Sequence, residues 1–179
     1  TTIWRGNIRF TPGMLFAIGF VSLFISGGLT GIFLGNSTLD IHLHDTYFVV
    51  AHFHIVMGVA SFFGMFAGVY HWFPKMYGRY LNNNMAYIHF WVTLVGAYLI
   101  FWPMHYSGLA GMPRRYTDWS NWQSFNQFQG MNTFISTVAM IVFAVQLLFV
   151  FNFFYSMFKG RKVKDQNPWG ANTLEWTTP

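Results

Sequence analysis

Two histidines separated by a single residue, His52 and His54, are the side chains of this sequence best placed to do chemistry. They lie in a stretch from residue 46 to residue 74 that holds no Asp, Glu, Lys or Arg. Polar rings in such apolar surroundings usually face a cavity or a cofactor. Positions two apart on an α-helix point about 200° around its axis. We therefore expect the two rings to leave opposite faces of one helix and to ligate two different cofactors.

Haem is a flat, apolar cofactor that takes neutral imidazole as an axial ligand. Two haems flanking one helix, with Phe53 between them, would suit rapid electron transfer. The adjacent pair Arg114 and Arg115 fits this interpretation, because guanidinium groups bind carboxylates bidentately and haem carries two carboxylate propionates. Two alternatives stay open: histidines satisfied by neighbouring backbone or hydroxyl groups, and an ordinary solvated arginine pair.

His44 and Asp45 stand side by side just before the apolar stretch. An imidazole and a carboxylate can hold a hard divalent cation such as magnesium, but two ligands make an incomplete site that needs water or a partner chain. Cysteine is absent, so a metal here must be held by histidine, carboxylate or another subunit. We interpret His71, His89 and His105, near the ends of predicted helices, as structural.

The composition places these residues in a membrane protein, because 54% of the residues are hydrophobic and only 8% are charged. Four stretches free of Asp, Glu, Lys and Arg each exceed the roughly 20 residues that a spanning helix needs. They predict an all-α integral membrane fold with transmembrane helices over residues 12–34, 48–73, 86–105 and 131–158. We place Pro12 in the first turn of the first helix and Pro74 just after the second.

The first predicted helix carries Gly27, Gly28 and Gly31, which either let a neighbouring helix approach closely or are simply tolerated there. Eight of the ten Lys and Arg residues fall on one side of the predicted bundle, at positions 5, 9, 75, 79, 159, 161, 162 and 164. The positive-inside rule then places both termini on the cytoplasmic or matrix side. Because the basic residues are distributed among several inner loops, they do not form the single basic face that nucleic-acid binding would need.

Three segments resemble the C-terminal third of subunit I of the haem-copper oxidases, of the cytochrome c oxidase type: Leu39–His54, His71–Pro74 and Gly111–Tyr116. The resemblance covers essentially residues 1–179 and implies that the four helices correspond to the ninth to twelfth of a twelve-helix subunit. Residues 159–179 would form a tail on the cytoplasmic side. The tail from Asn167 resembles that of bacterial members, which favours a bacterial inner membrane over the mitochondrial inner membrane.

The resemblance implies a role for most of the polar residues singled out above. His52 would be the catalytic-site ligand of the high-spin haem, and His54 a ligand of the low-spin haem. The remaining implied roles are Phe53 between the haems, Arg114 and Arg115 on the propionates, Asp40 in the hydrogen-bonded region around them, and His44 with Asp45 on magnesium. His42 has no implied role.

The implied cofactors are two haems of the A type, magnesium, and copper whose ligands lie outside this chain. The implied partners are the eight-helix N-terminal part of subunit I, subunit II with its dinuclear copper and a magnesium-binding glutamate, subunit III, cytochrome c and membrane lipid. The implied reaction reduces dioxygen to water and is coupled to proton translocation. No acidic residue or lysine lies inside the four predicted spans, so we expect this chain to be inactive alone.

The alternatives keep the fold or change the class of protein. A quinol oxidase has a similar subunit I, whereas a nitric oxide reductase is a more distant relative. A haem-binding membrane protein without turnover, or a transporter relaying metal ions or protons through its histidines, would belong to another class. The chain is either one product of a split subunit or a fragment of a longer polypeptide.

Overall fold

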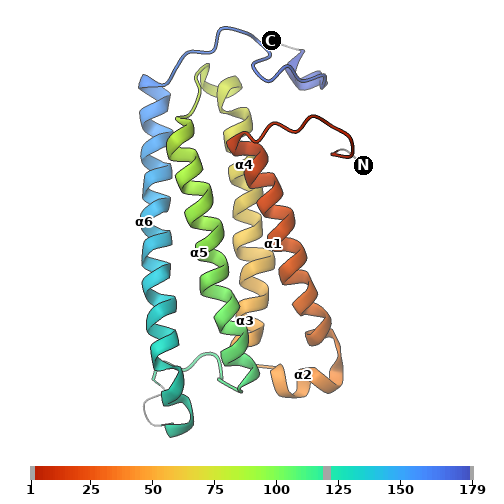
Figure 1. The fold of residues 1–179 in the computed structure, drawn as a ribbon, viewed down its shortest axis with the longest axis vertical. Coiled ribbons are helices and arrows are strands. Elements are labelled where there is room, and N and C mark those ends of the chain that lie inside the picture. Colours follow the sequence, from red (N-terminus) through yellow and green to blue (C-terminus); the bar gives the residue numbers. More distant parts are fainter. Residues whose placement is uncertain (1–2, 119–121, 178–179) are drawn as a thin grey trace.

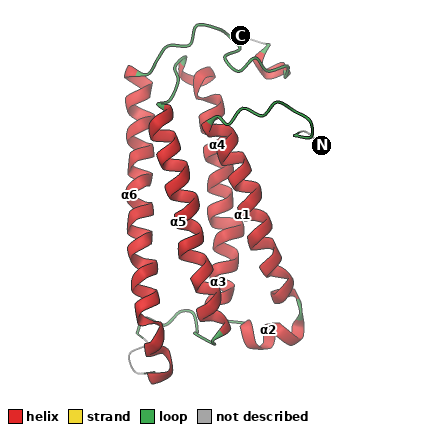
Figure 2. Ribbon diagram, in the orientation of Figure 1, coloured by secondary structure: helices red, strands yellow, loops and turns green. Residues whose placement is uncertain are grey.

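The computed structural model describes residues 3–118 and 122–177. Within these residues, four helical spans long and apolar enough to cross a membrane stand side by side (Figure 1). They are α1 (Pro12–Gly35), a continuous span from Tyr47 to Tyr77, α5 (Asn83–Leu109) and α6 (Gln129–Lys159), the last preceded by a 3₁₀ turn over Gln123–Phe128. The described elements are all helices joined by loops, as Figure 2 shows. The all-α, four-span prediction is confirmed.

The second span consists of three consecutive pieces: α3 (Tyr47–Phe53), a π-helical turn over His54–Val59, and α4 (Ala60–Tyr77). In the π turn the N–H of Ala60 donates to the carbonyl of Ile55, five residues back. A π turn holds an extra residue, which rephases the helix. The fully buried positions accordingly jump from Ile55 to Ala60. The sequence did not predict this turn.

Two helix ends differ from the prediction. Pro74 lies inside α4, which runs on to Tyr77, and α5 passes through Pro103 to end at Leu109. Proline removes one backbone donor and crowds the preceding turn. In a membrane bundle the neighbouring helices and local adjustments compensate for this loss. The prediction that Pro74 follows the second helix is therefore wrong, whereas Pro12 does begin α1, with the Thr11 hydroxyl accepting from the N–H of Met14.

A short helix that the sequence did not predict, α2 (Ser37–Leu43), joins α1 to the second span. Asn36 caps it, because the Asn36 side chain accepts a hydrogen bond of 3.0 Å from the N–H of Thr38. Figure 1 shows α2 at the end of the bundle opposite the two termini. This helix carries Asp40 and His42 and delivers the chain to His44.

The apolar core lies where α1, α4 and α5 meet, and Phe16 stands at its centre. The fully buried Phe16 ring contacts the rings of Phe63, Phe66, Tyr70 and Phe90 at centroid distances of 5.1 to 5.4 Å. Tilted, edge-on and stacked aromatic contacts of this kind are favourable beyond the area that they bury. The core therefore fixes α1 against α4, the C-terminal half of the second span.

Polar contacts, in addition to apolar ones, connect α4, α5 and α6 inside the bundle. The fully buried His89 accepts from the Tyr70 hydroxyl at Nδ1 over 3.2 Å and donates from Nε2 to Gln146 over 3.0 Å. The Gln146 amide in turn donates to the Thr93 hydroxyl at 3.0 Å. Both ring nitrogens of His89 are thereby satisfied, which confirms its structural interpretation.

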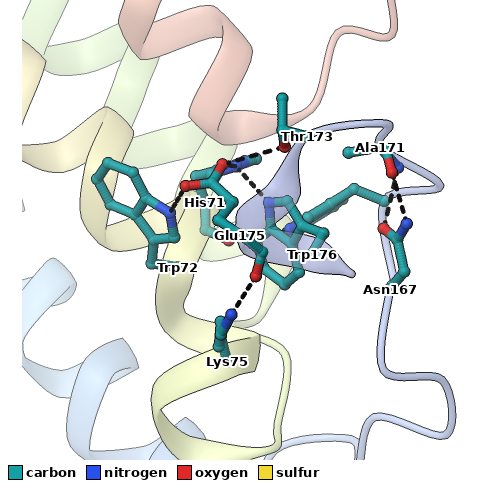
Figure 3. Close-up of polar contacts among 9 residues, drawn as sticks. His71, Trp72, Lys75, Asn167, Ala171, Thr173, Glu175 and Trp176 are labelled. Carbon is teal, nitrogen blue, oxygen red and sulfur yellow. Dashed lines mark hydrogen bonds and ion pairs between the residues drawn. The ribbon is translucent and has the colours of Figure 1, made fainter. Parts of the chain in front are cut away.

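The C-terminal tail packs against the C-terminal part of α4 around His71 (Figure 3). The His71 ring stacks on Trp169 at 5.9 Å and meets Trp176 edge-on at 5.2 Å. The Trp176 indole N–H donates to His71 Nε2 over 3.2 Å, and the Trp169 indole N–H donates to the His71 carbonyl over 2.9 Å. The Glu175 carboxylate accepts from Trp72 at 3.3 Å. These contacts confirm the structural interpretation of His71.

Both termini and the loop between α4 and α5 lie at one end of the bundle (Figure 1). Backbone hydrogen bonds pair this loop with the segment after α6, from Tyr80 N–H to Arg161 and from Val163 N–H to Gly78, each of 2.9 Å. The eight Lys and Arg residues of the predicted inner side therefore share one end of the molecule. Arg114 lies at the opposite end, in the loop that follows α5.

Trp176→Ala tests the docking of the C-terminal tail against α4. Trp176 is only 2% exposed, so its truncation should weaken tail docking by about 3 kcal/mol. Trypsin cleavage after the exposed Lys164 should then accelerate by up to about 100-fold, since proteolysis follows the open population. Leu174→Ala is the matched control, because Leu174 is 78% exposed in the same turn. Equal cleavage rates in the two variants would contradict the role given to Trp176.

Candidate functional site

His52 leaves the second span toward α1. Its Nδ1 lies 2.8 Å from the backbone carbonyl oxygen of Gly27. A carbonyl only accepts, so Nδ1 carries the hydrogen and the Nε2 lone pair is left free for a metal. The ring is half-buried, and its Cε1 lies against Gly31 of α1. His52 therefore has the tautomer of a metal-ligating histidine.

His54 leaves the same span on another face, toward α5. Its Nδ1 donates to the Val50 carbonyl one turn earlier over 2.7 Å, which again leaves the Nε2 lone pair free. The ring stacks on Phe101 of α5 at a centroid distance of 5.3 Å and an interplanar angle of 15°. The two histidines thus face different neighbouring helices, as their spacing predicts.

Phe53 stands between the two histidines in sequence and is 36% exposed. Its ring lies 4.3 Å from the ring of His54, measured between centroids. The aromatic side chain therefore lines the outer surface of the span between the two imidazoles, where it can cover a flat apolar ligand on its exposed side.

The glycines of α1 determine how closely the second span approaches. A Cβ atom at Gly27 would lie 2.7 Å from the Val56 side chain, and one at Gly31 would lie 2.8 Å from His52. Nothing lies within 4 Å of the corresponding position at Gly28. The close-packing interpretation is confirmed for Gly27 and Gly31 and is wrong for Gly28, which faces away from the contact.

The end of the bundle near α2 is held together by Arg114 and Asp45. The Arg114 guanidinium contacts the Asp45 carboxylate oxygen Oδ1 through Nη2 at 2.5 Å and Nε at 2.7 Å. The Arg114 N–H also donates to the Asp45 carbonyl over 2.9 Å, and Thr46 forms a bridge with Pro113. The hydrogen bond from Arg114 lowers the pKa of Asp45 more than desolvation raises it, and the charges of Arg114, His44 and Arg115 lower it further.

His44 lies within reach of two carboxylates. Its Nε2 is 3.7 Å from Asp45 Oδ2, and its Nδ1 is 3.8 Å from Asp40 Oδ2. Among the described residues, however, no group of three His, Cys, Asp or Glu side chains is arranged to hold a metal ion. His44 and Asp45 are thus brought together as predicted, and their magnesium role stays a prediction. Arg115 is exposed beside Arg114.

Sequence reasoning assigned no site role to Thr30 or His105, which both lie next to the site. The Thr30 hydroxyl is 2.9 Å from His52 Nδ1 and 2.7 Å from the Gly27 carbonyl. The local signal was its position three residues after Gly27, at which threonine hydroxyls reach a helix carbonyl. His105, 7% exposed, donates from Nδ1 to a backbone carbonyl, and its buried Nε2 has no partner in the described part of the chain.

Comparison with known proteins gives one family. The family model described as "Cytochrome C and Quinol oxidase polypeptide I" matches residues 1–142. The alternative cytochrome c oxidase subunit 1 of Bradyrhizobium diazoefficiens is 51% identical over 179 residues, covering 99% of this chain and 30% of its own length. Cytochrome c oxidase subunit 1 of Thermostichus vulcanus is 49% identical over 178 residues, covering 99% of this chain and 31% of its own length. This chain spans about a third of the length of these curated relatives.

The stabilising effect of the ion pair between Asp45 and Arg114 should be lost in acid. Because the fold lowers the pKa of Asp45 below 3.8, its stabilising effect is present above that pH and is lost as pH falls through the lowered value. Hydrogen exchange of the Arg114 amide, compared with an Asp45→Asn variant, measures this effect. We expect roughly twofold to fivefold faster exchange in the variant from pH 5 to 8, converging with the unsubstituted protein in acid. Asp165→Asn in the tail is the control. If the ratio of the exchange rates in Asp45→Asn and the unsubstituted protein did not change with pH, the stabilising role given to the Asp45 carboxylate would be contradicted.

Proposed function

The chain belongs to the cytochrome c and quinol oxidase polypeptide I family, and from this premise we propose that it is the C-terminal part of the catalytic subunit of a respiratory terminal oxidase. The complete enzyme would reduce dioxygen to water with electrons from cytochrome c and would couple this reaction to proton translocation. The observation that best supports the proposal is the pair of imidazoles whose Nε2 lone pairs are free on different faces of one membrane span.

Each histidine would hold one haem iron through Nε2. His52 would hold the high-spin haem of the oxygen-reducing centre, and His54 would hold the low-spin haem, both of the A type. A hydrogen bond from Nδ1 to an oxygen acceptor fixes the ring orientation and raises the basicity of Nε2, as in most metal-ligating histidines. When bound, the haems and the copper supply the electron transfer and the oxygen chemistry. Phe53 would lie between the two haems.

Arg114 and Arg115 would hold the haem propionates. Arg114 uses Nε and Nη2 for Asp45, and the guanidinium has five N–H donors, so further donors remain for another carboxylate. The exposed Arg115 is accessible to a second one. Asp40, 3.8 Å from His44, would take part in the hydrogen bonds around the propionates. A guanidinium stays charged at all relevant pH values, which suits it to this role.

The proposed magnesium site would use the two facing atoms His44 Nε2 and Asp45 Oδ2. They stand 3.7 Å apart, while Asp45 Oδ1 is occupied by Arg114. Magnesium prefers six oxygen-rich ligands, so most of its coordination must come from water and from a glutamate of subunit II. The chain would thus contribute the smaller part of a site shared between two subunits.

The partners proposed for this chain are the eight-helix N-terminal part of the subunit, subunits II and III, and cytochrome c. The copper ligands would come from the eight-helix part. The gathering of Lys and Arg at the end that carries both termini supports a cytoplasmic location for that end, in a bacterial inner membrane. The remaining apolar surface of the spans would face lipid and the partner helices.

A quinol oxidase of the same family is the second candidate, because the matching family description names both electron donors. The two candidates use the same histidines and differ in subunit II, where only a cytochrome c oxidase has the dinuclear copper. A non-catalytic haem protein or a histidine-relay transporter finds no support in the names of the relatives.

Histidine variants of the intact membrane complex test the haem assignments. In reduced-minus-oxidised spectra we expect two haem signals, only one of which carbon monoxide shifts. His52→Leu should remove the carbon monoxide-sensitive signal, and His54→Leu should remove the other, with turnover lost in both. His42→Leu, an exposed histidine in α2, is the matched control and should keep both signals. A complex without haem, or variants that leave both signals intact, would refute the proposal.

A further inference from the structure

We propose that Thr30 of α1 is a positioning residue for His52, acting on the electronic character of the high-spin haem ligand and leaving the low-spin ligand unaffected. This inference rests on the proposed function. It starts from two oxygen atoms and one nitrogen atom that all lie within hydrogen-bond distance of one another. Thr30 Oγ1 lies 2.7 Å from the Gly27 carbonyl and 2.9 Å from His52 Nδ1, and that nitrogen lies 2.8 Å from the same carbonyl.

The donors and acceptors in this triangle follow from its chemistry. The Gly27 carbonyl only accepts, so both the Thr30 hydroxyl and His52 Nδ1 donate to it. The single hydroxyl proton of Thr30 is then committed to Gly27, and Oγ1 meets the imidazole with a lone pair. The N–H of His52 is therefore shared between two oxygen acceptors.

A shared N–H has two consequences for the ring. Two acceptors on one helix restrict rotation of the imidazole about its bond to Cβ more than one acceptor would. Each acceptor also draws the Nδ1 proton and leaves more electron density on Nε2, the atom that would bind iron. A carbonyl oxygen has two lone pairs, so donation by Thr30 does not displace His52 from Gly27.

The surroundings of the hydroxyl keep the ring in place. Thr30 is only 9% exposed. Gly31, the next residue of α1, leaves room for the edge of the imidazole ring, because a Cβ atom at this position would lie 2.8 Å from His52 Cε1. The ring thus rests on α1 between a hydroxyl, a carbonyl and a glycine.

His54 provides an internal comparison. Its Nδ1 donates to the Val50 carbonyl of its own helix at 2.7 Å, and no side-chain acceptor is found for it among the described residues. The two ligands of the two proposed haems are therefore held differently, one by a neighbouring helix through two oxygens and the other by its own helix through one. A change at Thr30 should affect only the first.

Thr30→Val in the intact complex is the direct test, since valine keeps the shape and removes the hydroxyl. With less electron density on Nε2, the iron–histidine stretching band of the reduced high-spin haem should move to lower frequency and its midpoint potential should rise. The low-spin haem should keep its spectrum and potential. Turnover should fall by roughly tenfold, at the lower end of the cost of outer-shell substitutions.

Two matched controls accompany this variant. Thr30→Ser restores the hydroxyl and should restore the band position. Thr137→Val makes the same chemical change on the exposed face of α6, where the hydroxyl donates to the Thr133 carbonyl, and should leave both haems unchanged. Equal shifts of both haems in Thr30→Val would overturn the proposal, because they would indicate a general disturbance of the bundle.

A second pair of variants keeps the test decisive if Thr30→Val fails to assemble. Gly31→Ala should push the His52 ring off its acceptors and shift the same high-spin band, whereas Gly28→Ala, with open space around it, should be silent. An unchanged high-spin band in Thr30→Val or Gly31→Ala, with both haems present, would overturn the role of Thr30 but would leave the proposed function standing. Absence of haem from the unsubstituted complex would instead overturn the proposed function.

Discussion

The structure of the site depends on one constraint, which is that an imidazole N–H inside a bilayer must find its acceptor within the protein. His54 finds its acceptor in its own helix, and His52 reaches across to a carbonyl of α1. The second solution requires the two helices to approach closely, which the missing side chains at Gly27 and Gly31 permit. Because both acceptors are carbonyls, both rings are left with Nε2 as the free ligand atom.

The π turn that begins at His54 reconciles this arrangement with the packing of the rest of the span. The buried positions follow helical spacing through Phe48 and Ala51 of α3 to Ile55 at the start of the π turn. After it, the buried face begins again at Ala60 and continues through Phe63. The extra residue rotates α4 relative to α3. The α3 half of the span can therefore direct two histidines at two helices while α4 packs its aromatic rings against Phe16 of α1.

The sequence predicted those features that depend on the cost of charge in a membrane, namely the four spans and the opposed faces of His52 and His54. It did not reveal the π turn, because the second span is apolar on all sides and shows no polar face whose phase would change. Pro74 was misplaced because a proline is tolerated inside a helix of a membrane bundle, where neighbouring groups compensate for the missing donor. Thr30 is recognised only once α1 and α3 are seen in contact, since no local pattern links residue 30 to residue 52.

The arginine pair is the exception to the segregation of basic residues at one end of the bundle, and its charge is partly compensated by Asp45. Asp45 and Arg114 are linked by two side-chain contacts and one backbone hydrogen bond, and the hydrogen bond from Arg114 lowers the pKa of Asp45. Arg114 therefore adds little net positive charge at this end. The positive-inside rule counts Lys and Arg with little regard to nearby carboxylates, so both arginines remain exceptions to it, while the uncompensated charge rests mainly on Arg115. An anionic ligand bound at this end would compensate that remaining charge, which is the electrostatic reason for assigning carboxylate recognition to this pair.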